Sequence, residues 1–229
     1  MAAGAAAVAS LVGAARAQES VSLTVQSDYL LRGVSLSDGR PTLSFDVDYD
    51  DASGFYVAGS ATATNTRHAG VELLSAVADV GFARRLASGL TWDVGVSDSQ
   101  VSTFVGSRYV ANYAEVYAGL ARGGLAARLY FSPDYLGERT RTLYLDFSET
   151  VRPADRWRLT AHAGLLEVIE GEYGPLGGRS HLDLSASAAR DFGRFEARLT
   201  ASWADPPPVY PPGVGHGRAA LVAAVSAFF

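Results

Sequence analysis

The sequence lacks both cysteine and lysine, and all 19 of its basic residues are arginine. Without cysteine, neither a disulfide nor a thiolate metal site is available. The absence of lysine fits a codon bias and indicates no function. The formal net charge of −5 argues against nucleic-acid binding, which requires a basic face.

Long apolar runs are also missing. Beyond the N-terminus, no stretch has the roughly 18 consecutive apolar residues of a membrane helix. The hydrophobic share of 48% is ordinary for a globular protein. It also suits a membrane β-barrel, in which half of each strand faces a polar lumen. The 229 residues are enough for one barrel or for two small soluble domains.

The N-terminal segment is small and apolar and ends in Ala15-Arg16-Ala17, an A-x-A type cleavage site. It predicts a secretory signal peptide over residues 1–17, although the usual positive n-region is missing. The mature chain is then 18–229. In a Gram-negative cell, export leads to the periplasm or the outer membrane.

Apolar and polar residues alternate in segment after segment, which is the signal of a half-buried strand. In 42–50, for example, Leu43, Phe45 and Val47 oppose Ser44 and Asp46. The pattern predicts twelve strands, at residues 21–32, 42–50, 54–62, 71–83, 90–97, 110–121, 125–131, 143–151, 157–168, 182–189, 195–203 and 217–229.

Short and long connections alternate between these strands. The short turns lie at 50–54, 84–89, 122–124, 152–156 and 191–194. The long, polar loops lie at 33–41, 63–70, 98–109, 132–141, 169–180 and 204–217. This asymmetry predicts a single all-β, up-and-down antiparallel barrel in an outer membrane, with short periplasmic turns and long extracellular loops. Greek-key crossovers of a soluble sandwich would break the order.

Aromatic residues support the membrane interpretation. One set lies beside the short turns or at the C-terminus and predicts an interfacial girdle: Tyr49, Phe55, Phe82, Trp92, Trp157, Phe195 and Phe229. A sparser second girdle is predicted beside the long loops, at Tyr29, Phe131 and Trp203.

The last strand is apolar on one face and ends on an aromatic residue. Leu221, Ala223, Val225, Ala227 and Phe229 share that face. This end resembles the closing strand of bacterial outer-membrane β-barrels, and the resemblance implies that these residues carry the signal read by the barrel-insertion machinery.

The residues 27–35, SDYLLRGVS, resemble the opening motif of the proteobacterial Gcw_chp family, also described as TorF-type porins. Similar stretches follow in order at 37–41, 48–49, 53–56, 113–119, 132–137, 143–146 and 159–164. The resemblance implies a barrel that forms a pore in the outer membrane. It supplies no catalytic residue and no solute, and the Pro-rich loop 204–217 departs from the pattern.

If the apolar faces meet lipid, the polar faces line a lumen in which acids outnumber arginines. The predicted lumen residues are Asp28, Arg32, Asp46, Asp48, Asp79, Asp93, Glu115, Arg128, Asp146, Arg158, His162, Asp183, Glu196 and Arg198. Charged wall residues set ion selectivity, so a narrow, mildly cation-preferring pore is expected. The alternative is that these charges pair across the lumen and close it.

Asp28 and Arg32 lie four residues apart and are expected on the same strand face. They either bracket a ligand at the outer mouth or form a structural salt bridge beside a turn at Gly33 or Gly39.

Other functional classes have weaker support. An outer-membrane lipid hydrolase would need a histidine base, and His162 is the only histidine expected within a strand, on its lumen side. No metal site or cofactor is expected. A closed structural or adhesive barrel and a soluble lipocalin-like binder remain alternatives. The expected partners are outer-membrane lipid, the insertion machinery and small polar solutes or ions, but not nucleic acid; the oligomeric state is open.

Overall fold

The computed structural model describes residues 18–66, 70–102, 110–137, 139–171, 178–205 and 218–229. The signal peptide predicted at 1–17 lies outside the described residues and stays a prediction. Within the described ranges, no helix is long and apolar enough to cross a membrane.

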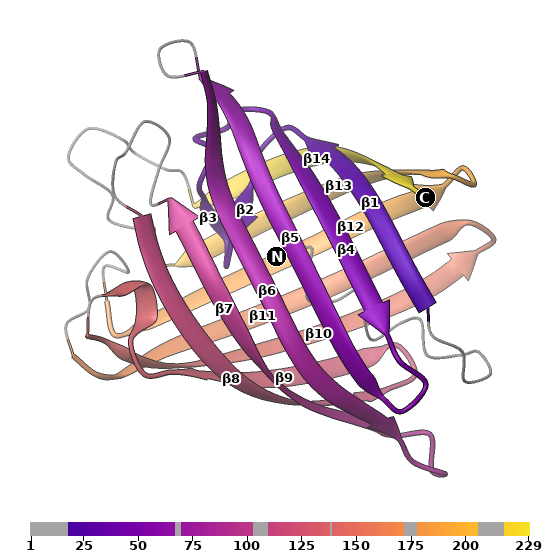
Figure 1. The fold of residues 1–229 in the computed structure, drawn as a ribbon. Coiled ribbons are helices and arrows are strands. Elements are labelled where there is room, and N and C mark those ends of the chain that lie inside the picture. Colours follow the sequence, from indigo (N-terminus) through magenta and orange to yellow (C-terminus); the bar gives the residue numbers. More distant parts are fainter. Residues whose placement is uncertain (1–17, 67–69, 103–109, 138, 172–177, 206–217) are drawn as a thin grey trace.

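Twelve antiparallel strands form a closed barrel, which confirms the predicted fold class (Figure 1). They are β1 (Gln18–Gln26), β4 (Thr42–Asp50), β5 (Phe55–Thr66), β6 (Gly70–Arg85), β7 (Thr91–Ser102), β8 (Val110–Arg122), β9 (Leu125–Ser132), β10 (Arg141–Ala154), β11 (Trp157–Glu170), β12 (Ser180–Asp191), β13 (Phe195–Asp205) and β14 (Ala219–Phe228). Each strand pairs with its neighbour in this order, and β14 pairs with β1 to close the barrel.

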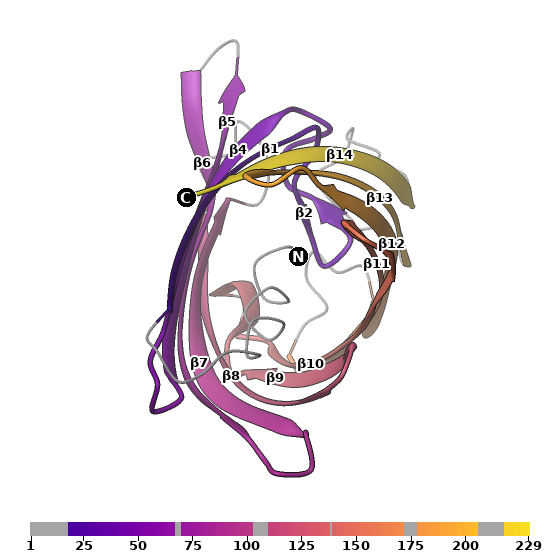
Figure 2. The ribbon, with the colours of Figure 1, turned by 90° about the vertical axis from the view of Figure 1, so that its right-hand side faces the viewer.

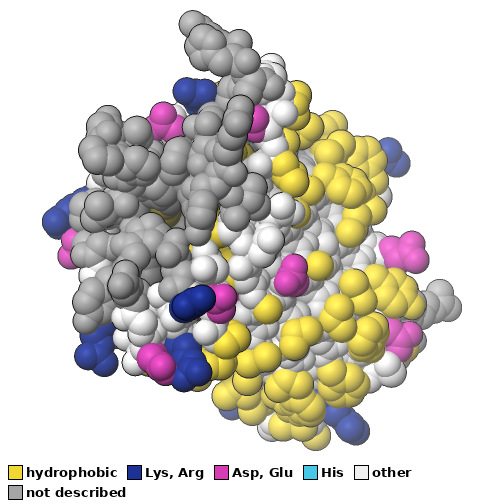
Figure 3. Space-filling model, turned by 60° about the vertical axis from the view of Figure 1, so that its left-hand side comes forward, with side chains coloured by type: hydrophobic (Ala, Val, Ile, Leu, Met, Phe, Trp, Pro, Cys, Tyr) yellow, Lys and Arg dark blue, Asp and Glu magenta, His cyan; other side chains and the backbone are white. Residues whose placement is uncertain are grey.

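The side-chain arrangement is the reverse of that in a water-soluble barrel. On β4, Leu43 and Phe45 are 50% and 45% exposed on the outside, whereas Thr42 and Ser44 are buried inside. Every barrel strand carries at least one exposed large hydrophobic side chain. Figure 3 shows such side chains gathered on one face of the wall. A continuous apolar exterior around a polar interior is the arrangement that a lipid environment favours.

The five short turns lie at one end of the barrel, together with the start of β1 and the end of β14 (Figure 1). The remaining connections lie at the other end. Two of the predicted long loops are shorter than expected, because β5 continues to Thr66 and β7 continues to Ser102. The intervening residues 67–69 and 103–109, like 206–217 of the Pro-rich loop, lie outside the described residues.

The prediction of one strand over 21–32 is wrong. β1 ends at Gln26, and the segment Ser27–Pro41, here called the strap, turns into the barrel (Figure 2). The strap contains the two-stranded hairpin β2 (Leu30–Leu31) and β3 (Val34–Ser35). Its turn residues Arg32 and Gly33 have φ of 49° and 75°, as a tight two-residue hairpin turn requires.

The carboxylate of Asp28 explains why the chain leaves the wall here. Asp28 accepts hydrogen bonds from the hydroxyls of Ser35 and Ser37, both at 2.6 Å, and from the backbone N–H of Gly39 at 3.2 Å. These bonds close the strap on itself and compete with continued strand pairing. Tyr29 therefore packs inside the barrel and is not part of an upper aromatic girdle.

β6 contains a bulge that changes the predicted faces. Ala63 pairs with Leu73 and Thr62 pairs with Ser75, so Leu74 has no partner across the pair. Leu74 is fully buried inside the barrel and Leu73 is 50% exposed outside, whereas the alternation predicts Leu74 on the outer face. One extra residue switches the side-chain parity for the rest of a strand.

Candidate functional site

The strap crosses the lumen and is fastened to both sides of it. At its turn, a Cβ on Gly33 would lie 2.8 Å from the Cβ atoms of Asp183 and Ala204, so the backbone contacts β12 and β13 directly. His181 Nε2 lies 2.9 Å from the carbonyl oxygen of Arg32. The Arg32 side chain extends the other way and reaches Glu115 on β8.

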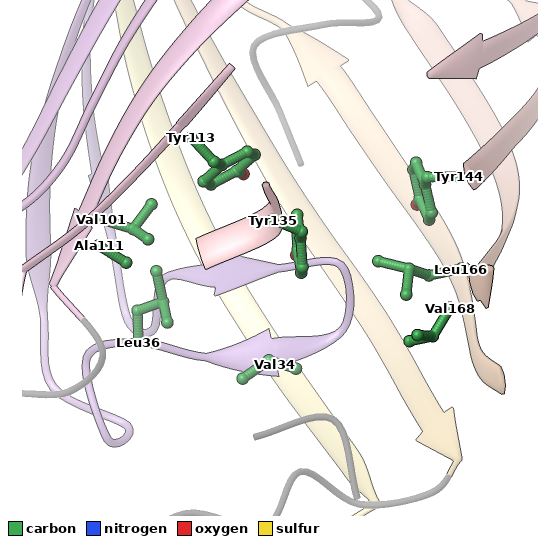
Figure 4. Close-up of a cluster of buried hydrophobic side chains, with 9 residues drawn as sticks. All are labelled: Val34, Leu36, Val101, Ala111, Tyr113, Tyr135, Tyr144, Leu166 and Val168. Carbon is green, nitrogen blue, oxygen red and sulfur yellow. The ribbon is translucent and has the colours of Figure 1, made fainter. Parts of the chain in front are cut away.

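An apolar cluster lies inside the barrel toward its long-loop end (Figure 4). Val34 and Leu36 come from the strap, and Tyr135 comes from the short 3-10 turn η1 (Tyr135–Gly137). They pack against wall residues of β7, β8, β10 and β11, namely Val101, Ala111, Tyr113, Tyr144, Leu166 and Val168. Burial raises the pKa of the Tyr135 hydroxyl, so this side chain is neutral at pH 7.

A row of tyrosines lies across the inner wall. Tyr117 is opposite Tyr130 on the neighbouring strand, and Tyr130 is opposite Tyr144. The ring centroids are 5.3 Å and 6.1 Å apart. A Cβ at Gly95 would overlap Tyr117, and one at Gly164 would overlap Tyr144. The glycines therefore allow these rings to lie flat against the sheet, which leaves their faces toward the lumen.

Arg32 sits in a cage that this row helps to form. Its Nη2 donates to both carboxylate oxygens of Glu115, at 2.8 Å and 2.6 Å. The guanidinium carbon lies 4.1 Å, 5.1 Å and 5.9 Å from the ring centroids of Tyr144, Tyr135 and Tyr130. We call Glu115, Tyr130, Tyr135 and Tyr144 the cation cage. Arg32 is 5% exposed and Glu115 is 4% exposed, so the pair is shielded from water.

Several other lumen acids are paired with a basic group. Arg128 Nη2 lies 2.7 Å from Asp93 Oδ2. Arg158 Nη2 donates to Glu196 Oε2 at 2.5 Å, and Arg198 lies 3.8 Å from the same carboxylate. The Arg128–Asp93 and Arg158–Glu196 pairs each span one intervening strand, from β7 to β9 and from β11 to β13, and they offset negative charge on that side of the barrel.

Asp46, Asp48 and Asp79 form a contrasting group, here called the acidic wall. Ser22 and Ser20 donate hydrogen bonds to Asp46 and Asp48, at 3.2 Å and 3.0 Å. Asp48 is opposite Ala58, which is in turn opposite Asp79, so the two acids lie in one row across β4, β5 and β6. None of the three forms an ion pair with an arginine in the part of the chain that the structure describes.

Comparison with protein families shows which family the chain belongs to. Residues 12–205 match the family described as bacterial protein of unknown function (Gcw_chp). This chain belongs to the Gcw_chp family. The match covers most of the sequence and confirms the resemblance carried by the motif in the strap. Comparison with curated proteins finds no match.

Solved structures with a similar fold include two porins. The NanC porin superposes with a TM-score of 0.64 at 12% identity, covering 93% of this chain and 100% of that chain. The KdgM porin superposes with a TM-score of 0.54 at 11% identity, covering 91% and 98%. A KdgM structure in complex with disordered oligogalacturonate gives 0.53 at 10% identity, covering 91% and 98%. At such identities the likeness shows the fold alone.

The Gcw_chp structure places the predicted lumen residues in two groups. Asp28 and Arg32 come from the strap and are buried; the other predicted residues belong to barrel strands. The interpretation of Asp28 and Arg32 as neighbours on one strand face is wrong, because neither belongs to a barrel strand and Arg32 pairs with Glu115. The turn beside Arg32 does use Gly33, with φ 75°.

Sequence reasoning missed the tyrosines and His181. The signal for the tyrosines was present, because Tyr113 and Tyr117 share strand parity with Glu115, and Tyr144 shares parity with Asp146. His181 gave no such signal, because its partner is a backbone carbonyl 149 positions away in the sequence.

His162 does not have the surroundings of a catalytic base. Its Nε2 lies 2.9 Å from Asp183 Oδ1 and its Nδ1 lies 3.7 Å from Asp146 Oδ1. A serine hydrolase needs one ring nitrogen free to accept the proton of the nucleophile. Here Nε2 is hydrogen-bonded to the Asp183 carboxylate, and among the described residues no serine hydroxyl is hydrogen-bonded to the ring. Among the described residues, no group of three or more metal-ligating side chains is found.

The terminal strand closes the barrel as expected. Leu221, Val225 and Phe229 are exposed on the outer face, and the backbone N–H of Phe229 donates to the carbonyl of Val21 at 3.0 Å. Whether this face is the insertion signal stays a prediction.

Proposed function

We propose that this Gcw_chp protein resides in the outer membrane and allows passive passage of small cations and small polar solutes through a narrow, mildly acidic lumen. The observation that carries the proposal is the acidic wall. Asp46, Asp48 and Asp79 place negative charge on β4 and β6, and none of the three forms an ion pair with a described arginine. Uncompensated acids along a constriction favour cations.

The comparison with KdgM bears on the charge of the expected solute. That porin is described in complex with oligogalacturonate, an oligosaccharide that carries carboxylates. The acidic wall would repel such an anion at close range. We therefore expect this protein to differ from KdgM in charge preference while sharing its fold. No catalytic role is proposed, because among the described residues His162 is hydrogen-bonded to Asp183 and to no serine hydroxyl.

A barrel that stays closed is the second candidate. The apolar cluster of the strap and η1 is the specific observation that favours it, because it lies inside the barrel toward the long-loop end. The two candidates differ in one property, which is whether the folded protein conducts ions.

The acidic wall is tested by the triple variant Asp46→Asn, Asp48→Asn and Asp79→Asn, which removes charge and keeps size. In a planar bilayer under a salt gradient, its reversal potential should move from the cation-selective side toward zero. Glu149→Gln is the matched control, because Glu149 is an exposed acid of β10 outside the acidic wall, and its reversal potential should stay unchanged. An unaltered reversal potential in the triple variant would contradict the assignment.

A further inference from the structure

The cation cage consists of groups that do not belong to the strap. Glu115, Tyr130 and Tyr144 come from β8, β9 and β10, and Tyr135 comes from η1. Tyr130 and Tyr144 are held opposite each other by strand register. Tyr135 stacks edge-on against Tyr113, with ring centroids 4.8 Å apart. Three of the four cage residues are therefore held by barrel strands, and Tyr135 is held by η1 and its contact with Tyr113.

The cage has the chemistry of a site for an organic cation. A carboxylate in a dry surrounding offers strong charge-assisted hydrogen bonds to N–H groups. Aromatic faces within about 6 Å of a cation attract it through the ring quadrupole, and the attraction grows when water is excluded. A guanidinium suits such a site well, because it is planar, stacks on rings and is less strongly hydrated than an ammonium.

We propose that the cation cage is a binding site for guanidinium-type organic cations, and that Arg32 of the strap occupies it as a built-in ligand. The inference deepens the proposed pore function, on which it rests for the arrival of the cation through the lumen. A solute that takes the cage displaces Arg32 and removes the ion pair that fastens the strap to β8. Binding of the solute is thereby coupled to release of the strap.

A free guanidinium can form more hydrogen bonds in the cation cage than the side chain of Arg32 does. Only Nη2 of Arg32 bonds to Glu115, while Nη1 is buried with no hydrogen-bond partner among the described residues. The backbone of Arg32 is held by the turn and by His181, which limits how the side chain can rotate. A free guanidinium can turn so that two nitrogens meet the two carboxylate oxygens.

The test is binding of methylguanidinium to the refolded full chain in detergent micelles, measured by isothermal titration calorimetry. Arg32→Ala empties the cage and should bind methylguanidinium about tenfold or more tightly than the wild type, in which the tethered Arg32 competes at high effective concentration. Arg158→Ala is the matched control. It also removes the nearer ion-pair partner of a glutamate, Glu196, which keeps Arg198 at 3.8 Å; since Arg158 stacks on no described ring, the affinity should stay at the wild-type level.

The double variant Arg32→Ala with Glu115→Gln should lose the added affinity, because the cage keeps its rings and loses its charge. Equal binding by the wild type, Arg32→Ala and Arg158→Ala would overturn the proposal, as would full binding by the double variant. Folding of each variant is checked by heat-modifiable migration, and Arg32→Gln replaces Arg32→Ala if the latter does not refold.

The calorimetric readout needs no ion flow, so the two hypotheses fail separately. Tight binding by Arg32→Ala in a barrel that never conducts would overturn the pore and support the cage. Conductance in the wild type with no methylguanidinium site in Arg32→Ala would support the pore and overturn the cage.

Discussion

The hydrogen-bond and ion-pair partners of the charged lumen side chains explain which charges are paired and which are not. Arg32 and Glu115 are almost fully buried, and such a pair is tolerated only when its hydrogen bonds and ring contacts replace water. Asp46 and Asp48 accept hydrogen bonds from serine hydroxyls, which stabilise a carboxylate without cancelling its charge. The difference between the two groups is the residue-level basis for the cation preference that we propose.

The flat tyrosines lead to a prediction at Gly164. A methyl group there would overlap the Tyr144 hydroxyl and the Asp183 carboxylate, so Gly164→Ala should destabilise the barrel by roughly 1–3 kcal/mol through overpacking. The measurement is urea unfolding of the refolded protein, followed by tryptophan fluorescence.

Gly59→Ala is the control for that experiment, because the nearest atom to its added Cβ is Val47 Cγ2 at 3.4 Å. It should unfold at nearly the wild-type urea concentration. Equal midpoints for Gly164→Ala and Gly59→Ala would show that Tyr144 does not need the space above Gly164.

Individual strands were predictable because a membrane barrel exposes one face of each strand to a different medium from the other. Leu43, Phe45 and Val47 identify the outer face of β4 without any knowledge of its partners. The alternation of apolar and polar residues gave a wrong prediction at 27–32. There β2 is itself a strand, so the alternation continues into the strap beyond the end of β1. The bulge at Leu74 was equally invisible, because it depends on the register against β5.

The free-energy cost of placing a charge on the outer face of β10 should depend on the depth of the residue in the membrane. Leu145 is exposed between the apolar residues Leu129 and Leu165 of the neighbouring strands, so it lies within the apolar band. Val151 is on the same face, near the short turn that precedes Trp157. Leu145→Arg should cost about 2–4 kcal/mol and Val151→Arg about 0–1 kcal/mol.

Urea unfolding in lipid vesicles measures both variants of β10. Since both substitutions place an arginine on the outer face of β10, depth is the main difference between them. A penalty at Val151 as large as that at Leu145 would mean that the apolar band extends to the turn.

The last strand gives a prediction about assembly. Phe229 pairs through its backbone with Val21 and points its ring outward, so Phe229→Ser removes the aromatic ring while leaving strand pairing possible. If the ring is part of the insertion signal, the amount of folded barrel in outer membranes should fall severalfold, and Phe229→Tyr should restore it. Normal assembly of Phe229→Ser would show that the signal lies elsewhere.

The barrel as a whole followed from the alternation of short and long connections, which only an up-and-down topology explains at this regularity. The arrangement of side chains inside the barrel could not be predicted from the sequence. Which charges pair across the lumen depends on strand register, and the course of the strap depends on contacts such as that between Arg32 and Glu115, 83 positions apart. The acids and arginines were predicted as lumen residues, but the cage that joins Arg32 to the tyrosines required the three-dimensional structure.

The pore itself is tested most directly by the conductance of the refolded wild-type protein in a planar lipid bilayer under a salt gradient. The acidic wall predicts discrete conductance steps with a reversal potential on the cation-selective side. A protein verified as folded that gives no steps, or steps that select anions, would contradict the proposed function.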